Sequence, residues 1–174
     1  MDILKKLFGS NKNKLDDNNS NKLDLGALLA SSDVNGSIIE LDNYICKLAS
    51  WGDTVENLTK PQRYFYFNQD IEREVNNGGF AQFFFNSSGK HAHETVLSLQ
   101  AIGALKTADL LKQAIAQFPE ASVPKDREER TGMFRIIMEK ANPVWNQLDK
   151  EFYTYEDNLN ELNLAYVKQN RQSF

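Results

Sequence analysis

Two adjacent glycines, Gly78 and Gly79, interrupt a run of residues with helical periodicity, and they constrain how the chain can fold. On both sides of the pair, apolar residues recur at steps of three and four, the spacing of one face of an α-helix. The first run is Tyr64, Phe67, Ile71 and Val75, and the second is Phe80, Phe83 and Phe84. We therefore predict two helices joined by a sharp turn, the glycine elbow. Gly78 is expected in the left-handed conformation that ends a helix, and Gly79 is expected to let another segment approach its backbone.

Polar residues flank the glycine elbow, and one of them is unfavourably placed. Glu74 lies in the last turn of the first helix, where a carboxylate opposes the negative end of the helix dipole. We expect Glu74 to accept hydrogen bonds from amides at the start of the Phe80 helix, or from the side chain of Gln82 or Asn86, and so to fasten the corner. The alternative is a polar binding pocket formed by Glu74, Asn77, Gln82 and Asn86. We favour the fastened corner, because buried polar groups usually satisfy one another before they serve a ligand.

Helical periodicity recurs along most of the chain, whereas no stretch shows the alternation and hairpin turns of a β-sheet. An amphipathic helix is predicted from residue 38 to Gly52, and Thr59 is a predicted cap for the helix that enters the elbow. The spacers between predicted helices are short. The sequence therefore predicts an all-α fold, an irregular antiparallel bundle of several helices with the glycine elbow between two central ones.

Further boundaries follow from glycine, proline and capping residues in the second half of the chain. Gly103 is predicted to divide residues 97–118 into two helices. Asp126 is a predicted cap, and Pro143 is predicted to interrupt the helix that begins there. The last helix is predicted to carry four residues on one face, namely Tyr155, Leu159, Leu162 and Tyr166.

Length and composition fit one globular unit. The chain has 174 residues, of which 41% are hydrophobic, so it can bury a substantial core. Residues 1–37 are predicted to be a flexible tail and linker, with a short amphipathic piece at 1–8 and a polar stretch at 9–24. The helical domain is expected at 38–174. The sequence contains no apolar run long enough to cross a membrane, and the single Cys46 cannot form an internal disulfide, so we expect a cytoplasmic protein.

Candidate catalytic or metal-binding residues are few. His91, His93 and Glu94 are the nearest approach to a metal site, but residues two apart on a helix do not share a face and no further ligand follows at a suitable spacing. Exposed histidines at a helix start are the simpler interpretation. Cys46 stands among apolar residues and is expected to be a buried small side chain rather than a nucleophile. We therefore expect no enzyme and no metal.

Acidic residues gather near the end of the sequence. The whole chain has a formal charge of −4, which argues against a broad surface for nucleic acid. The candidate partner-binding residues are Asp149, Glu151, Glu156, Asp157 and Glu161. Asp157 and Glu161 are four residues apart and are expected to project together from one helix face. Such carboxylates could bind the basic face of a DNA-binding protein in place of phosphates, or could form an ordinary solvated surface.

Several motifs together resemble a known family. They are Glu74-Val75-Asn76-Asn77-Gly78-Gly79-Phe80 with Gln82 and Asn86, Ala101-Ile102-Gly103-Ala104, Phe152-Tyr153, Glu156-Asp157 and Tyr166. Over roughly residues 38–170 the chain resembles a bacterial all-helical domain of unknown function, the DMP-nineteen-like family, whose typifying member is a DNA mimic. The resemblance implies a helical fold without a cofactor, and an acidic surface that occupies a transcriptional regulator in place of DNA.

Of the five acidic candidates, only Glu156 and Asp157 match acidic positions of that family, and the other three come from charge spacing. Basic residues are expected to interrupt the acidic surface, among them Lys125, Arg127, Arg130 and Arg135. We expect a non-enzymatic binding protein with a basic DNA-binding protein as its partner, no direct contact with nucleic acid, and a homodimer as a possible assembly.

Two alternatives to the DNA mimic stay open. The first is an immunity-type inhibitor that neutralises a nuclease toxin through the same acidic face. The second is a small-ligand or enzymatic domain with a pocket at the glycine elbow, around Asn77, Gln82, Asn86 and His91.

Overall fold

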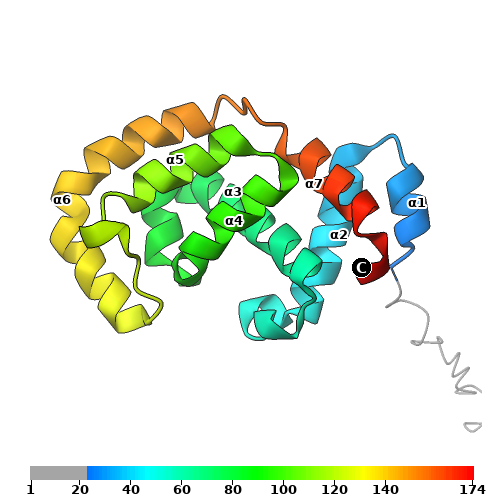
Figure 1. Cartoon of the computed structure of the whole chain (residues 1–174), viewed down its shortest axis with the longest axis horizontal. Coiled ribbons are helices and arrows are strands. Elements are labelled where there is room, and N and C mark those ends of the chain that lie inside the picture. Colours follow the sequence, from blue (N-terminus) through cyan, green and yellow to red (C-terminus); the bar gives the residue numbers. More distant parts are fainter. Residues whose placement is uncertain (1–22) are drawn as a thin grey trace, which may run out of the picture.

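The computed structural model describes residues 23–174, and the regular elements in this range are all helical (Figure 1). The prediction of an all-α fold is confirmed. The α-helices are α1 (Leu25–Ala30), α2 (Val34–Leu48), α3 (Lys60–Phe85), α4 (Ala92–Ile102), α5 (Leu105–Ile115), α6 (Arg127–Phe152) and α7 (Leu159–Gln169). Short 3-10 helices are η1 (Ser50–Gly52), η2 (Val55–Asn57), η3 (Ser87–His91), η4 (Pro119–Ala121) and η5 (Arg171–Ser173).

Helix α3 is the central element, and it contributes to two different hydrophobic clusters. Its first turns, with Phe65 and Phe67, pack with α1, α2 and α7. From Ile71 onward, across the glycine break to Phe84, it packs with α4, α5 and α6. Figure 1 shows these two groups of helices on either side of α3. The fold is therefore the irregular multi-helix bundle that the sequence predicts.

A buried polar group joins three helices near the middle of α3. Asn68 Nδ2 donates to Asn163 Oδ1 on α7 at 3.0 Å, and Ser98 Oγ on α4 donates to Asn68 Oδ1 at 2.7 Å. All three side chains are fully buried. Because a buried polar atom is costly without a partner, this triad sets the position of α4 and α7 along α3.

The glycine elbow breaks α3 at the predicted place, but the roles of the two glycines differ from the prediction. Gly79 has φ 73° and ψ −176°, a combination that is essentially restricted to glycine. Gly78 has φ −169°, which is extended backbone, so the prediction of a left-handed Gly78 is wrong. A Cβ atom at Gly79 would collide with the carboxylate of Asp149, which confirms that another segment approaches its backbone. The close approach of Asp149 is at Gly79, the same glycine that has the positive φ.

The end of α6 and the residues after it satisfy backbone groups that the break leaves without helical partners. Asp149 Oδ1 accepts from the Phe80 amide at 2.8 Å. The Tyr153 hydroxyl donates to the Val75 carbonyl at 2.8 Å. Each contact replaces a hydrogen bond that a continuous helix would have made along α3. We call this set of contacts the elbow clamp.

Glu74 fastens the corner by accepting hydrogen bonds from two side chains, which is one of the two arrangements predicted for it. Its Oε2 accepts from Gln82 Nε2 at 2.9 Å and from Asn86 Nδ2 at 2.8 Å. The predicted corner is thus confirmed for Gln82 and Asn86, while the amide at the start of the Phe80 helix binds Asp149 instead. Asn77 is exposed and takes no part in the corner.

Helical structure begins earlier than predicted. The boundary was expected at residue 38, yet α1 lies within the predicted tail of residues 1–37, and α2 also starts there. Asp24 caps α1 by accepting from the Ala27 amide, and Leu28 is buried against the cluster of α2 and α7. Tertiary packing holds this short helix, which composition alone did not indicate. The predicted amphipathic piece at residues 1–8 lies outside the described residues.

Helix α6 runs through Pro143 without interruption, so the predicted break there is wrong. Proline removes one hydrogen bond from a helix and bends it, but tertiary packing can hold the two parts together. Here Trp145 is fully buried and donates from Nε1 to the Ala114 carbonyl on α5 at 3.0 Å. The long helix curves around the outside of α5 in Figure 1.

Three further predicted boundaries are confirmed, whereas α2 ends at Leu48 and not at Gly52 as predicted. Thr59 and Gln62 form a capping box at the start of α3, Gly103 ends α4 with φ 85°, and Asp126 caps α6. Tyr155, however, precedes α7 and has φ 50°, so it does not share the helix face of Leu159. The chain needs this left-handed turn to pass from α6 to α7.

Gly79→Ala is expected to lower the free energy of unfolding by about 3 kcal/mol or more, because the backbone conformation excludes a Cβ and the Asp149 carboxylate must move. Gly132→Ala is the matched control. It lies inside α6, where a Cβ meets no atom within 4 Å, and should raise the free energy of unfolding by up to about 1 kcal/mol. Urea unfolding followed by circular dichroism measures both. Equal effects of the two substitutions would contradict the role given to Gly79.

Candidate functional site

The predicted acidic face is divided by the fold. Asp149 is half-buried in the elbow clamp, and burial raises the pKa of its carboxyl although the Phe80 amide acts against that shift. Asp157 lies before α7, and its Oδ2 accepts from the Thr107 amide at 2.8 Å and the Thr107 hydroxyl at 3.0 Å. The expectation that Asp157 and Glu161 project together from one helix face is therefore wrong. Glu161 is exposed in the first turn of α7.

Three of the predicted acidic residues meet a fourth that sequence spacing did not reveal. A groove of about 120 Å³ lies between α5 and the end of α6 with the segment after it. Its charged lining, which defines the acidic groove, is Asp109, Glu151, Glu156, Asp157 and Lys106. The groove is thus lined by four carboxylates and a single ammonium group, that of Lys106. Lys106 Nζ lies 4.0 Å from Glu156 Oε2.

Arg130 does not interrupt the acidic surface, contrary to the prediction, because it is 1% exposed. Its guanidinium donates to the carbonyls of Phe84 and Asn86 at the end of α3, at 3.1 and 3.2 Å. It also donates to the carbonyls of Pro124 and Lys125 just before α6. Arg130 is thus a structural residue that ties the second half of α3 to the start of α6.

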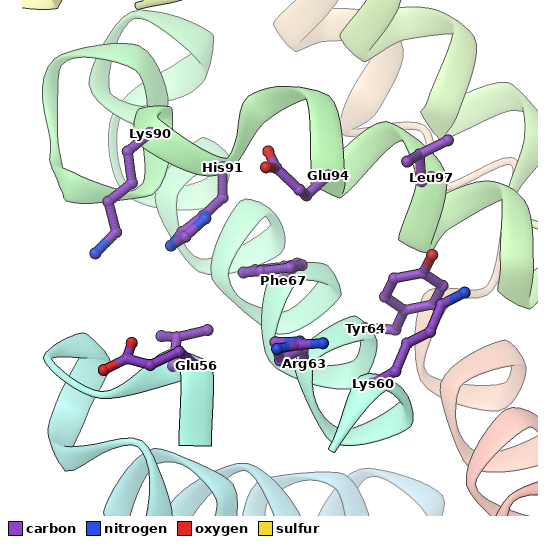
Figure 2. Close-up of a pocket in the computed structure, with 10 residues that line it drawn as sticks. Glu56, Lys60, Arg63, Tyr64, Phe67, Lys90, His91, Glu94 and Leu97 are labelled. Carbon is purple, nitrogen blue, oxygen red and sulfur yellow. The ribbon is translucent and has the colours of Figure 1, made fainter. Parts of the chain in front are cut away.

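A second hollow, of about 350 Å³, lies between the first half of α3 and the start of α4 (Figure 2). Residues from η2 and η3 complete its wall. We call it the cationic pocket. Its lining residues are Val55, Glu56, Lys60, Arg63, Tyr64, Phe67, Lys90, His91, Glu94 and Leu97. Of these residues, only His91 was among those predicted to line a ligand pocket. The others lie on several separate elements, and the sequence alone does not show that these elements meet.

Three cations and two carboxylates, Glu56 and Glu94, line this pocket. Within residues 23–174, Lys60, Arg63 and Lys90 form no salt bridge. Lys60 Nζ lies 5.3 Å from the centre of the Tyr64 ring, a cation–π contact. The pocket therefore combines positive charge with aromatic surface.

His91 and Glu94, which line this pocket, each contain a buried polar atom without a partner among the described residues. The His91 ring lies 4.6 Å from the Phe67 ring, and burial, followed by the nearby Lys90 charge, lowers the pKa of His91 to about 4. His91 is consequently neutral at pH 7. Glu94 Oε1 binds Lys125 Nζ; burial alone would raise the pKa of Glu94, but this hydrogen bond brings it below its usual value. His91 Nε2 and Glu94 Oε2 have no hydrogen-bond partner among the described residues.

The fold does not bring together the four residues that were predicted to line a ligand pocket at the glycine elbow. Gln82 and Asn86 are bound to Glu74, and Asn77 is exposed at the break. His91 instead lines the cationic pocket, beside the first half of α3. The fold separates these residues because η3 turns the chain away from the elbow before α4 begins.

The histidines and the cysteine do not gather into a metal site. Among residues 23–174, no three His, Cys, Asp or Glu side chains are placed to hold a metal ion. His93 Nε2 accepts from the Val123 amide at 3.2 Å. Cys46 is buried, as predicted, and burial together with Asp42 raises the pKa of its thiol to about 12, so it is protonated at pH 7.

The family model described as DMP19-like protein matches residues 56–170. This match covers most of the chain and includes the elbow, the acidic groove and all of the cationic pocket except Val55. The chain belongs to the DMP19-like family. No curated protein and no solved structure matches it. Helices α1 and α2 lie outside the matched region of this DMP19-like protein, and no helix in its described part is long and apolar enough to span a membrane.

The lowered pKa of His91 predicts a pH dependence of stability. The unfolded chain binds a proton near pH 6.5 and the folded chain only near pH 4, so protons favour unfolding in between. Compared with His91→Gln, the native protein should lose on the order of 1 kcal/mol of unfolding free energy from pH 7 to pH 4.5, after allowing for partial exposure. An NMR titration of the ring gives the pKa directly. A value at or above 6.5 would contradict the burial of this side chain.

Proposed function

We propose that this DMP19-like protein is a non-enzymatic binding protein that occupies the DNA-binding surface of a basic partner through the acidic groove. The observation that supports this most is the meeting of Asp109, Glu151, Glu156 and Asp157 in one groove with Lys106 alone among them. Family membership supports the same proposal, because the resemblance of this chain to a DNA-mimic family implies such a partner.

Carboxylates can replace DNA phosphates because both present negative oxygen acceptors to arginine and lysine. The described part of the chain is more acidic than the whole. Residues 1–22 contain five lysines and three aspartates, so residues 23–174 carry a formal charge of −6 against −4 for the full sequence. This charge would speed the encounter with a basic partner and weaken binding as salt is added.

Two of the groove carboxylates are held in place before any partner arrives. Asp157 is fixed by the backbone and hydroxyl of Thr107. Glu151 Oε1 accepts from Gln147 Nε2 at 3.1 Å, one turn earlier on α6. A fixed carboxylate loses less conformational entropy on binding than a free one, so the groove is suited to recognition.

Two classes of basic partner fit this groove, a transcriptional regulator and a nuclease. We favour the regulator, because the family resemblance implies it. A nuclease would be the partner if the protein suppressed DNA cleavage in place of DNA binding, which gives the two alternatives separate readouts. For the cellular compartment we propose the cytoplasm, in keeping with a single buried cysteine.

Reversing charge in the groove is expected to weaken partner binding. The full chain is used to capture partners from native extract, and a captured DNA-binding protein is then purified and titrated. Asp109→Lys with Glu156→Lys should weaken its binding at least tenfold, and duplex DNA should compete with the native protein. Glu128→Lys with Glu139→Lys, both exposed on α6 outside the groove, form the control pair and should change binding less than twofold.

The salt series gives an independent test of the same proposal. Affinity for the purified partner should fall steadily between low and high salt, because opposite surfaces attract. An affinity that salt does not change, or that the groove and control pairs weaken equally, would exclude the acidic groove as the binding surface.

A further inference from the structure

We infer that the cationic pocket binds a small aromatic anion, a flat ring that carries a carboxylate or phosphate group and at least one N–H or O–H donor. This site is separate from the acidic groove. It lies against the first half of α3, whereas the groove lies between α5 and α6, so neither proposal depends on the other.

The apolar wall of the pocket suits an aromatic ring in the ligand. Phe67 lies at the centre of the hollow, between side chains of α4 above it and of η2 and α3 below it in Figure 2. Tyr64 continues this wall on the same face of α3, and Leu97 on α4 is 55% exposed. Because Phe67 itself is only 4% exposed, a flat apolar ring would mainly remove the exposed surface of Tyr64 and Leu97 from water, as in most small-molecule sites.

The negative charge of the ligand follows from the cations of the pocket. Lys60, Arg63 and Lys90 form no salt bridge within the described chain. Of the two carboxylates in the pocket, Glu94 is paired with Lys125, which leaves Glu56 alone against three cations. Arginine binds carboxylates and phosphates through two parallel hydrogen bonds, and a lysine adds a point charge, so an anionic group is the complementary ligand.

The donor of the ligand follows from the two buried atoms that lack a partner. Glu94 Oε2 can only accept a hydrogen bond while ionised, so the group that satisfies it must donate. His91 Nε2 is satisfied by either a donor or an acceptor, depending on its tautomer. The lowered pKa of His91 agrees with a neutral ring that contributes hydrogen bonds rather than charge.

The volume of the pocket, about 350 Å³, agrees with a ligand of the size of a mononucleotide or a smaller aromatic acid. These two sources share one chemistry, and two probes separate them. Indole-3-carboxylate has a carboxylate and a ring N–H, and guanosine 5′-monophosphate has a phosphate and a base with N–H donors. Benzylamine, an aromatic cation, is the negative control because the same ring would bring a positive charge to three cations.

The test is a titration of the full chain with each probe, followed by calorimetry and by NMR shifts of the His91 ring and the Leu97 methyl groups. At least one anionic probe should bind with a Kd in the millimolar range or below and shift both signals. Binding of guanosine monophosphate alone would assign a phosphate ligand, and binding of indole-3-carboxylate alone a carboxylate ligand. If neither probe binds at millimolar concentration, or benzylamine binds equally well, the proposal is overturned.

Variants locate the binding site. The double substitution Arg63→Gln with Lys90→Gln should raise the Kd of the anionic probe at least tenfold, because the anionic group loses its positively charged partners. Arg135→Gln with Lys140→Gln removes the same two charges from exposed positions on α6 and should change the Kd less than twofold. Thermal unfolding checks that each variant folds, and Lys60→Gln, at an exposed position, provides a milder substitution in the pocket. Equal effects of the pocket and control pairs would overturn the assignment.

Discussion

The contact between the Asp149 carboxylate and the backbone at Gly79 is the constraint on which the rest of the structure depends. It holds the break in α3. The segment after the break faces the same hydrophobic cluster as Ile71 and Val75 just before it, while Phe65 and Phe67 near the start of α3 face the other cluster. With the break in place, Phe80 and Phe84 pack in the cluster of α6 while Phe65 and Phe67 pack in the cluster of α2 and α7. The elbow also sets where the chain leaves α3, and so where η3 places Lys90 and His91 beside the cationic pocket.

The position of a carboxylate in the fold, rather than its place in the sequence, decides what it does. Asp149 and Asp157 belong to the same acidic stretch as Glu151 and Glu156, yet both bind backbone amides of other helices. An amide without a helical partner attracts the nearest fixed acceptor, and a short aspartate side chain can be fixed most easily. The longer Glu151 and Glu156 stay exposed and keep their charge available to the acidic groove.

Features that depend on neighbours in the sequence were predictable. The cap at Thr59, the helix boundary at Gly103 and the bonds from Glu74 to Gln82 and Asn86 all depend on residues at most 12 positions apart. Features that need the tertiary arrangement were not. The meeting of Asp109 with Glu151, the burial of Arg130, the cationic pocket and the continuity of α6 through Pro143 arise from packing between segments, which periodicity and propensity do not encode.

The hydrophobic cluster of α1, α2 and α7 combines helices from both ends of the described chain, which affects when they can pack during synthesis. Leu164 and Val167 of α7 complete the hydrophobic cluster that contains residues of α1, α2 and the first turns of α3. Helices α1 and α2 are synthesised first, and they cannot complete their packing until α7 is present. The elbow clamp likewise joins residues 69 positions apart, and it can close only after α6 has formed. A nascent chain that ends before α7 exposes apolar faces of α2 and α3. Such a chain depends on the completion of synthesis to escape aggregation.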